Sequence, residues 1–238
     1  QTVLNQIMDR ITALFTKEKQ FIANVSHELL TPIALLKNKF ENLLQNESLD
    51  DAAVDKIVSS LRTLDLLKKV IANLLLISKI ENNQYEVNET IDFDAIITDL
   101  LASLQDRIED KKLVIHKNLQ HHFSFLGNKT LIHILFYNLV VNAVKYNKPR
   151  GTIEINDGFL NGNYFLSISD SGIGMNEKQQ QHVFKRFARV SSDQEGLGLG
   201  LAIVESIAQF HHIIIEITSE INVGTTFRLL FPAKQKHN

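Results

Sequence analysis

The 238-residue chain contains no cysteine, no tryptophan and only three prolines. Without cysteine there is no disulfide, no thiolate metal site and no cysteine nucleophile, and the composition fits a reducing compartment. No apolar run approaches the roughly 18 to 20 residues of a membrane span, so we expect this chain not to be membrane-embedded. Its first residues, QTVLNQIMDR, are neither a signal peptide nor a natural start, and we interpret the chain as part of a longer protein.

A large excess of charge of one sign is also absent. The chain has 25 basic and 27 acidic residues, a net charge of -2 and a pI near 6.5. Such a chain has no basic field for nucleic acid or an anionic membrane, so no nucleic-acid partner is expected. The length allows one large domain or two unequal ones.

The first third of the chain has apolar residues at helical spacing, from about residue 4 to 44 and from 54 to 80, with the polar string QNESLDD between them. This pattern predicts two long amphipathic helices in a helical hairpin, assigned to residues 1–80. A single hairpin cannot bury so continuous an apolar stripe, so two hairpins are expected to form a four-helix bundle in a homodimer. Residues 81–92, which begin with ENNQYEVNE, are interpreted as a linker.

From residue 93 the pattern changes to mixed helices and strands. Helices are predicted at 93–109, 129–145 and 199–210, and strands at 113–118, 124–126, 152–156, 163–169, 213–218 and 225–231. This order favours an α+β sandwich with helices over one face of a sheet, assigned to residues 93–235.

The string FIANVSHELLTP places a histidine on the first predicted helix. If Val25 and Leu29 face the bundle core, His27 lies two positions from each and, at about 100° per residue, falls on the solvent-facing side. Thr31 is one turn further along that same side. Pro32 removes a backbone donor, so the helix is expected to bend close to the histidine.

Glu28 lies beside His27 in the sequence. A carboxylate that takes or holds the proton on one ring nitrogen leaves the other lone pair free, so this pair can act as base and nucleophile. For a lone histidine, a solvated surface position is the simpler interpretation. The complete string SHELLTP favours the reactive one.

A polar stripe marks the helix predicted at 129–145. Asn138, Asn142, Lys145 and Tyr146 are spaced at i, i+4, i+7 and i+8, opposite an apolar face. An amide oxygen suits Mg²⁺, which also binds substrate phosphates, and the lysine suits the phosphates. Taken alone, the stripe is also typical of a solvated helix face.

The string DSGIGM follows a predicted strand. Asp170 can accept a hydrogen bond from an exocyclic amino group, and Gly172 and Gly174 let the backbone approach a flat ring. By itself the string is more typical of a turn.

A glycine repeat, GLGLGL, precedes the last predicted helix. Gly196, Gly198 and Gly200 leave backbone amides unobstructed before the helix N-terminus, which makes a phosphate cradle. A dinucleotide fold is the alternative, but no strand leads directly into these glycines and the GxGxxG spacing is incomplete. There is no GxxxxGKS or GxxxxGKT string for a P-loop.

Taken in order, SHELLTP, NLVVNAVKY, DSGIG, FKRF, GLGLGL and GTTF resemble the motifs of two-component sensor histidine kinases. Their H box precedes a GHKL-type ATP-binding domain, shared with type II topoisomerases, mismatch-repair ATPases and a heat-shock chaperone. The resemblance covers nearly all of the chain. It implies autophosphorylation of His27 by ATP, transfer to an aspartate of a response regulator, and a phosphatase activity in the reverse direction. It also implies that the chain is the cytoplasmic portion of a bacterial inner-membrane sensor.

The resemblance assigns roles to individual residues. Glu28 is then the general base, and Thr31 positions water for dephosphorylation. In the ATP-binding domain it implies Asn142 as the Mg²⁺ ligand with Asn138 in support, Lys145 and Tyr146 near phosphate and nucleoside, Asp170 on the adenine amino group, Phe184 and Phe187 as lid anchors, Arg189 at the terminal phosphate, the amides of Gly196, Gly198 and Gly200 on phosphates, and Thr225 near the adenine.

Two positions depart from the family pattern. Leu30 stands where the family usually has arginine, and the HHI string at 211–213 stands where it often has a glycine pair. The adjacent histidines at 121–122 and 211–212 are poor zinc candidates, because neighbouring side chains point apart. Two other functions stay open: an ATPase of the chaperone or topoisomerase kind, which forms no phosphohistidine, and a non-catalytic scaffold.

Overall fold

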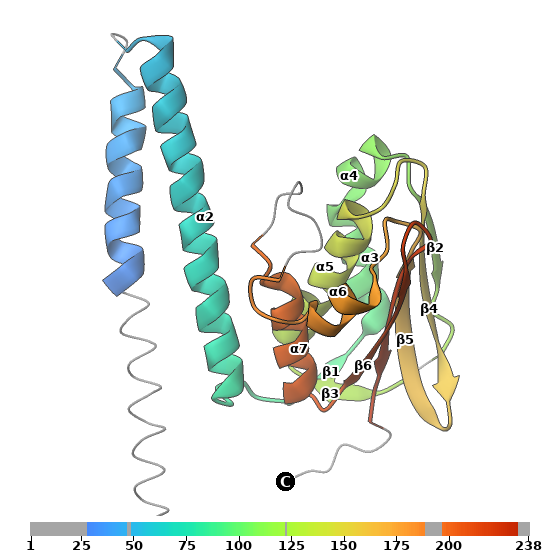
Figure 1. The fold of residues 1–238 in the computed structure, drawn as a ribbon. Coiled ribbons are helices and arrows are strands. Elements are labelled where there is room, and N and C mark those ends of the chain that lie inside the picture. The colour runs from blue at the N-terminus through green and yellow to red at the C-terminus, as the bar shows by residue number, and fades with distance from the viewer. Residues whose placement is uncertain (1–27, 47–48, 122, 189–196, 233–238) are drawn as a thin grey trace, which may run out of the picture. The chain divides into compact units, whose positions relative to one another are not determined.

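The structure is a computed structural model that describes residues 28–46, 49–121, 123–188 and 197–232. The chain divides into two compact units, Gln1–Gln84 and Tyr85–Asn238 (Figure 1). His27, Arg189 and Gly196, for which sites were predicted, lie outside the described residues.

The first unit is a helical hairpin. Its first helix includes residues 28–44, and α2 extends over Asp51–Glu81 (Figure 1). The Asp50 side chain accepts a hydrogen bond from a first-turn amide of α2 at 2.7 Å, which fixes where that helix begins. Across the hairpin, Lys37 Nζ lies 2.8 Å from Asp65 Oδ1. The predicted hairpin is confirmed for the described residues, and the part predicted before residue 28 lies outside them.

The second unit is an α+β sandwich. Its helices are α3 (Phe93–Ser103), α4 (Gln105–Asp110), α5 (Lys129–Lys145), α6 (Glu177–His182) and α7 (Gly200–Phe210). Its strands are β1 (Glu89–Ile91), β2 (Val114–Asn118), β3 (Phe125–Gly127), β4 (Thr152–Leu160), β5 (Asn163–Asp170), β6 (Ile214–Glu220) and β7 (Gly224–Leu230). The main sheet has the order β2-β4-β5-β7-β6, and only its β2–β4 pair is parallel.

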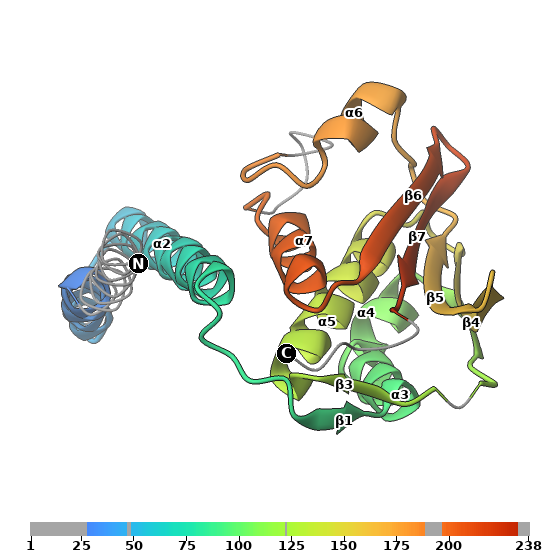
Figure 2. The same cartoon turned by 90° about the horizontal axis from the view of Figure 1, so that it is seen from below.

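One face of this sheet is covered by helices. Figures 1 and 2 show α3, α5 and α7 gathered over that face. The alternation along β4 explains the arrangement, because Ile153 and Ile155 are completely buried whereas Glu154 between them is exposed. The predicted fold class is therefore confirmed.

The sheet register determines where the predicted site residues meet. Antiparallel pairing of β5 with β7 sets Asp170 opposite Thr225. The loop that follows β5 reaches the end of α5, since the Ile173 amide donates to the Tyr146 carbonyl at 3.1 Å. Motifs separated by about 80 residues in the sequence are thus brought to one end of the domain.

Parts of the secondary structure differ from the prediction. The helix predicted at 93–109 is interrupted at Leu104, a buried residue whose ψ of 7° leaves the helical range, so two helices form. The expected linker at 81–92 is shorter, because α2 continues to Glu81 and residues 89–91 pair with β3. The short helix α6 was missed, although Asn176 and Gln179 form a capping box at its start.

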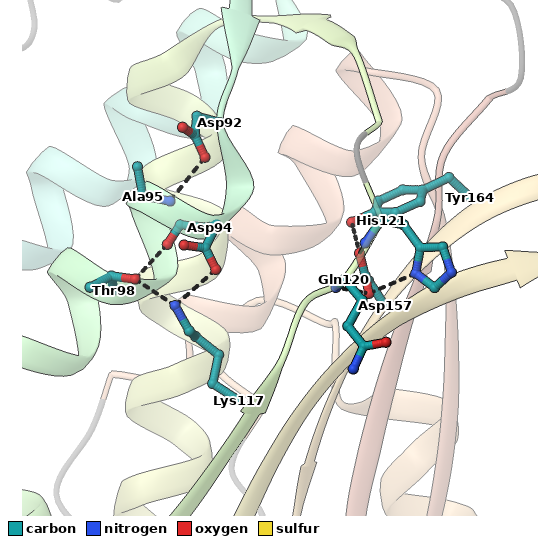
Figure 3. A network of polar contacts seen from close by, with 9 residues as sticks. All are labelled: Asp92, Asp94, Ala95, Thr98, Lys117, Gln120, His121, Asp157 and Tyr164. Atoms are coloured by element: carbon teal, nitrogen blue, oxygen red, sulfur yellow. Dashed lines mark hydrogen bonds and ion pairs between the residues drawn. The ribbon is translucent and has the colours of Figure 1, made fainter.

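A polar network fastens the segment before β3 to the sheet (Figure 3). The Asp157 side chain, only 1% exposed, accepts hydrogen bonds from the amides of Gln120 and His121, from His121 Nδ1 and from the Tyr164 hydroxyl. The four contacts are 2.9 to 3.1 Å long. A buried carboxylate with this many donors stabilises the fold.

Candidate functional site

The residues beside the predicted nucleophile are accessible. Glu28 and Thr31 are both exposed on the first helix, whereas Ile33 is 6% exposed. Residues three apart lie on neighbouring positions of one helix surface. This placement fits the general base and water-positioning roles proposed for the pair.

The hairpin leaves a row of leucines exposed. Leu29, Leu36 and Leu43 recur every seven residues with 44%, 45% and 49% of their surface accessible. Leu66 and Leu67 on α2 are similarly exposed. Large apolar side chains at heptad spacing are typical of a helix that packs against further helices.

The predicted polar stripe of α5 exists. Asn138, Asn142, Lys145 and Tyr146 are all half-buried, and the opposite face of the helix is buried. Asn138 Nδ2 donates to the Ile134 carbonyl at 2.8 Å. Lys145 Nζ lies 3.3 Å from the Tyr146 hydroxyl and 4.7 Å from the centre of its ring. The lysine is thereby held near the C-terminal end of the helix.

A pocket opens beside this stripe. It is lined by Asn142, Tyr146, Asp170, Ile173, Gly174, Met175, Val183, Leu201, Thr225 and Phe227. Five of these ten are predicted site residues. The other five are apolar and were missed by sequence reasoning, because a pocket wall and a core position carry the same kind of residue. An apolar pocket with a few polar groups suits a flat heteroaromatic ring.

Asp170 is the ionisable group of the pocket. Burial raises the pKa of its carboxyl group to about 6, although hydrogen bonds from the backbone amides of Gly172 and Thr225 oppose the shift. The contact from the Gly172 amide to Asp170 Oδ1 is 2.8 Å. A carboxylate has room for about four donors, so acceptor capacity is left for a ligand.

Close backbone contacts explain the glycines around Asp170. A Cβ atom on Gly172 would lie 2.2 Å from the Tyr146 carbonyl oxygen. Gly174 has a φ of +64°, and its Cβ would lie 1.8 Å from the Glu220 carbonyl. The loop therefore requires glycine for its own packing, whatever it binds.

The N-terminus of α7 lies against α5. A Cβ atom on Gly200 would approach Asn138 Oδ1 to 2.6 Å, so this glycine lets the two helices touch. Leu199, the N-cap residue, supplies no side-chain hydrogen bond to the first turn. The N-cap side chain therefore does not occupy the first-turn amides, as a phosphate cradle requires.

The segment before the glycine repeat contains the two predicted phenylalanine anchors. Phe184 is half-buried, whereas Phe187 is 57% exposed and has a φ of +66°. The Phe187 amide donates to the Gly198 carbonyl at 2.8 Å. The described contact of Phe187 with the glycine repeat is thus made by its backbone.

Thr225 reaches the pocket through a cluster that the sequence did not reveal. Its side chain is buried, and Thr225 Oγ1 lies 2.8 Å from Ser219 Oγ. The Met175 amide donates to that same serine oxygen at 2.8 Å. Ser219, on the edge strand β6, therefore joins the neighbouring strand β7 to the loop after β5.

His211 is a neutral structural residue. Its Nδ1 lies 2.9 Å from the Ile207 carbonyl, and its Nε2 accepts a hydrogen bond from the Asn128 amide at 3.0 Å. Burial lowers the pKa of this imidazole, and the adjacent His212 contributes to the shift. Within the described ranges, no three histidine, aspartate or glutamate side chains gather as a metal site. His212 has a φ of +57°, at the turn where the family often has glycine.

Comparisons with known proteins identify the two units. Residues 17–83 match the family described as the His Kinase A (phospho-acceptor) domain. Residues 127–235 match the family described as Histidine kinase-, DNA gyrase B-, and HSP90-like ATPase. The chain is thus a phosphoacceptor domain followed by an ATPase domain.

Relatives that match nearly the whole chain identify the protein family more specifically. The heme sensor protein HssS of Staphylococcus aureus strain MSSA476 is 30% identical over 230 residues, which is 96% of this chain and 50% of that protein. The HssS protein of strain MW2 gives the same values. The chain belongs to the two-component sensor histidine kinases, and it spans about half the length of the curated relatives that it matches.

Solved structures show the same fold. The Acinetobacter baumannii histidine kinase AdeS has a TM-score of 0.63 and 25% identity, covering 88% of this chain and 98% of that one. Full-length ShkA in complex with AMPPNP has a TM-score of 0.74 and 21% identity, covering 90% of this chain and 45% of that one. In the described part of the chain, no helix is long and apolar enough to cross a membrane.

Proposed function

We propose that this chain is the catalytic part of a sensor histidine kinase that transfers the γ-phosphoryl group of ATP to His27 and then to an aspartate of a response regulator. The observation that carries the proposal is that one chain contains both a phosphoacceptor hairpin and an Asp170 pocket in a matching ATPase domain. A nucleophile and a nucleotide on separate units must be brought together by movement of one unit.

On the hairpin, Glu28 holds the proton on one ring nitrogen of His27, and the other nitrogen attacks the γ-phosphorus. The bond from that phosphorus to the bridging oxygen breaks, and ADP leaves. Thr31 serves the reverse, phosphatase direction by positioning the attacking water. The exposure of Glu28 and Thr31 supports these roles.

In the ATPase domain, Asp170 accepts a hydrogen bond from the adenine amino group, and Thr225 lies near the ring. Lys145 and Arg189 hold phosphate oxygens, with the backbone amides of the glycine repeat. A Mg²⁺ ion would be held by Asn142, supported by Asn138. The half-buried amide in the pocket lining fits a cation that keeps most of its waters and binds phosphates. The ion would neutralise charge on the phosphates.

The phosphoacceptor hairpin is proposed to act as a homodimer. The exposed leucines on its two helices support pairing with a second hairpin into a four-helix bundle. A response regulator would then dock on this bundle. The full-length protein is proposed to be a bacterial inner-membrane sensor with this chain on the cytoplasmic side.

The test is incubation of the purified chain with Mg²⁺ and γ-labelled ATP, beside His27→Gln. The expected label is acid-labile and base-stable, and it disappears in the variant. Label retained in His27→Gln contradicts the assigned nucleophile. ATP hydrolysis without any label favours an ATPase of the chaperone or topoisomerase kind, and binding without turnover favours a scaffold.

A further inference from the structure

A partly buried polar junction joins the segment after α5, the start of β4 and the loop that follows β5. Asn147, which is 5% exposed, accepts a hydrogen bond at Oδ1 from the Ser171 hydroxyl at 3.2 Å. Its Nδ2 donates to the Thr152 carbonyl at 2.9 Å. The Thr152 amide donates to Ser171 Oγ at 2.8 Å and closes the ring. These three residues are called the Asn147 junction below.

The Asn147 junction adjoins two pocket residues on opposite sides. Asn147 directly follows Tyr146, and Ser171 directly follows Asp170. The contact between Asn147 and Ser171 therefore acts on the spacing between the aromatic ring and the carboxylate, together with the backbone hydrogen bonds from Ile173 to Tyr146 and from Ser171 to Thr152. It acts through side chains that are not themselves in the pocket lining.

The α5 side of the junction is independently anchored. Lys111 Nζ lies 2.6 to 3.1 Å from the carbonyl oxygens of Val144, Lys145 and Asn147. Burial lowers the pKa of this lysine. An ammonium group on the last carbonyls of a helix satisfies acceptors that the helix leaves open. Lys111 thus holds the end of α5 in place, and the Asn147 junction positions the loop after β5 against it.

The junction leaves little room for adjustment. A Cβ atom on Gly151 would lie 2.1 Å from Asn147 Oδ1 and 2.7 Å from Ser171 Oγ. A Cβ on Gly172 would meet both the Tyr146 carbonyl and Asp170 Oδ1. Loss of the Ser171 hydroxyl would leave Asn147 Oδ1 with the Lys148 amide as donor, at 3.0 Å, and would remove the side-chain contact to the loop.

We propose that Asn147 and Ser171 are positioning residues that hold the Asp170 carboxylate in register with Tyr146 and so set the preference for adenine over guanine nucleotides. The proposal rests on the nucleotide site described above. Adenine presents an amino group to an acceptor where guanine presents a carbonyl oxygen, so discrimination depends on where the carboxylate lies. A displaced carboxylate loses the adenine contact and gains nothing with guanine.

The test is isothermal titration calorimetry of the intact chain with ATP and with GTP in the presence of Mg²⁺. Ser171→Ala and Asn147→Ala are expected to weaken ATP binding about tenfold and GTP binding by less than about twofold, the loss of one buried hydrogen bond. Ser171→Thr keeps the hydroxyl and restores the ATP-to-GTP ratio. Ser167→Ala is the matched control, because Ser167 lies nearby on β5, is buried and donates to the Asn156 carbonyl through its hydroxyl.

Several outcomes overturn the proposal. They are a wild-type chain without preference for ATP, variants that keep the wild-type ratio, and variants in which both affinities fall in the same proportion as in Ser167→Ala. If circular dichroism shows that Asn147→Ala does not fold, the comparison of Ser171→Ala with Ser171→Thr tests the proposal instead.

The variant Asp170→Asn distinguishes failure of the proposed nucleotide site from failure of the positioning role. Unchanged ATP binding in that variant contradicts the nucleotide site itself, and the positioning role is then wrong with it. Weakened ATP binding in Asp170→Asn, together with wild-type ratios in the junction variants, contradicts only the positioning role.

Discussion

Two aspartates of the same sheet, Asp157 on β4 and Asp170 at the end of β5, have pKa values shifted in opposite directions. Burial acts to raise the pKa of Asp157, but hydrogen bonds from the His121 ring, two backbone amides and the Tyr164 hydroxyl outweigh it (Figure 3). Burial raises the pKa of Asp170 to about 6, because only two backbone amides oppose it.

The difference between the two lies in the number of donors. The Asp157 side chain is only 1% exposed, yet its ionised form is favoured because its lone pairs are used within the protein. Asp170 keeps acceptor capacity and faces a pocket. A satisfied carboxylate stabilises a fold, whereas one with spare acceptor capacity is suited to bind a ligand.

The largest effect is expected from Asp170→Asn. ATP affinity should fall at least about a hundredfold, because the amide is a weaker acceptor than the carboxylate and carries a competing donor. The nucleotide-free chain should become more stable at pH 7 by about 1 to 3 kcal/mol, since a carboxylate that burial disfavours is removed. Calorimetry and urea unfolding measure the two effects. A variant with wild-type affinity, or one less stable than wild type, contradicts the comparison.

Asp157→Asn should give the opposite pattern. Its NH₂ group replaces one carboxylate oxygen and turns a donor toward one of the two backbone amides, that of Gln120 or that of His121, so unfolding free energy should fall by about 2 to 3 kcal/mol. ATP affinity should stay within about twofold, because Asp157 does not line the pocket. Asp94→Asn is the control, since its ion pair with Lys117 is partly exposed and contributes about 1 kcal/mol or less. Equal destabilisation by the two variants would show that the Asp157 donors have no special weight.

The helices and strands that were predicted correctly are those marked by residues close to them in the sequence, such as a cap or a continuous apolar pattern. The bounds of α5 agree with the prediction because Asn128 caps the helix and the apolar pattern is continuous. The strand β1 was missed because its three residues are held by pairing with β3, more than 30 residues away. The interruption at Leu104 was missed because both sides of it carry a helical pattern.

In the candidate site, too, some features could be predicted from nearby residues and others depend on the tertiary structure. Asn142 and Asp170 were predicted by residue type and spacing, and both line the pocket. Its apolar walls, such as Ile173 and Leu201, were not distinguishable from core residues. The contact between Asn147 and Ser171 joins residues 24 apart, so it depends on tertiary placement that no local pattern encodes.

The pH dependence should also separate the two aspartates. The folded pKa of Asp170 is about 6 against an ordinary 3.8, so the folded chain binds this proton more tightly. Its contribution to stability is therefore lost as pH rises from about 4 to 6, while ATP affinity should increase about tenfold between pH 5 and 7. Asp157 has a depressed pKa, and its contribution is lost as pH falls below its ordinary value. Titrations of wild type and Asp170→Asn isolate the first effect, and an unchanged affinity profile in the variant would contradict it.

The smallest effect is expected from Tyr164→Phe, which removes one of the donors to Asp157, at 3.1 Å, and keeps the ring stacked on Phe123. Unfolding free energy should fall by about 1 kcal/mol, with ATP affinity unchanged. Tyr137→Phe is the control on an exposed tyrosine. In Asp157→Asn, the same Tyr164 change should cost less, because the hydroxyl has lost its charged acceptor. If the two costs simply add, the hydroxyl does not stabilise the carboxylate, and the lowered pKa of Asp157 depends on His121 and the backbone amides alone.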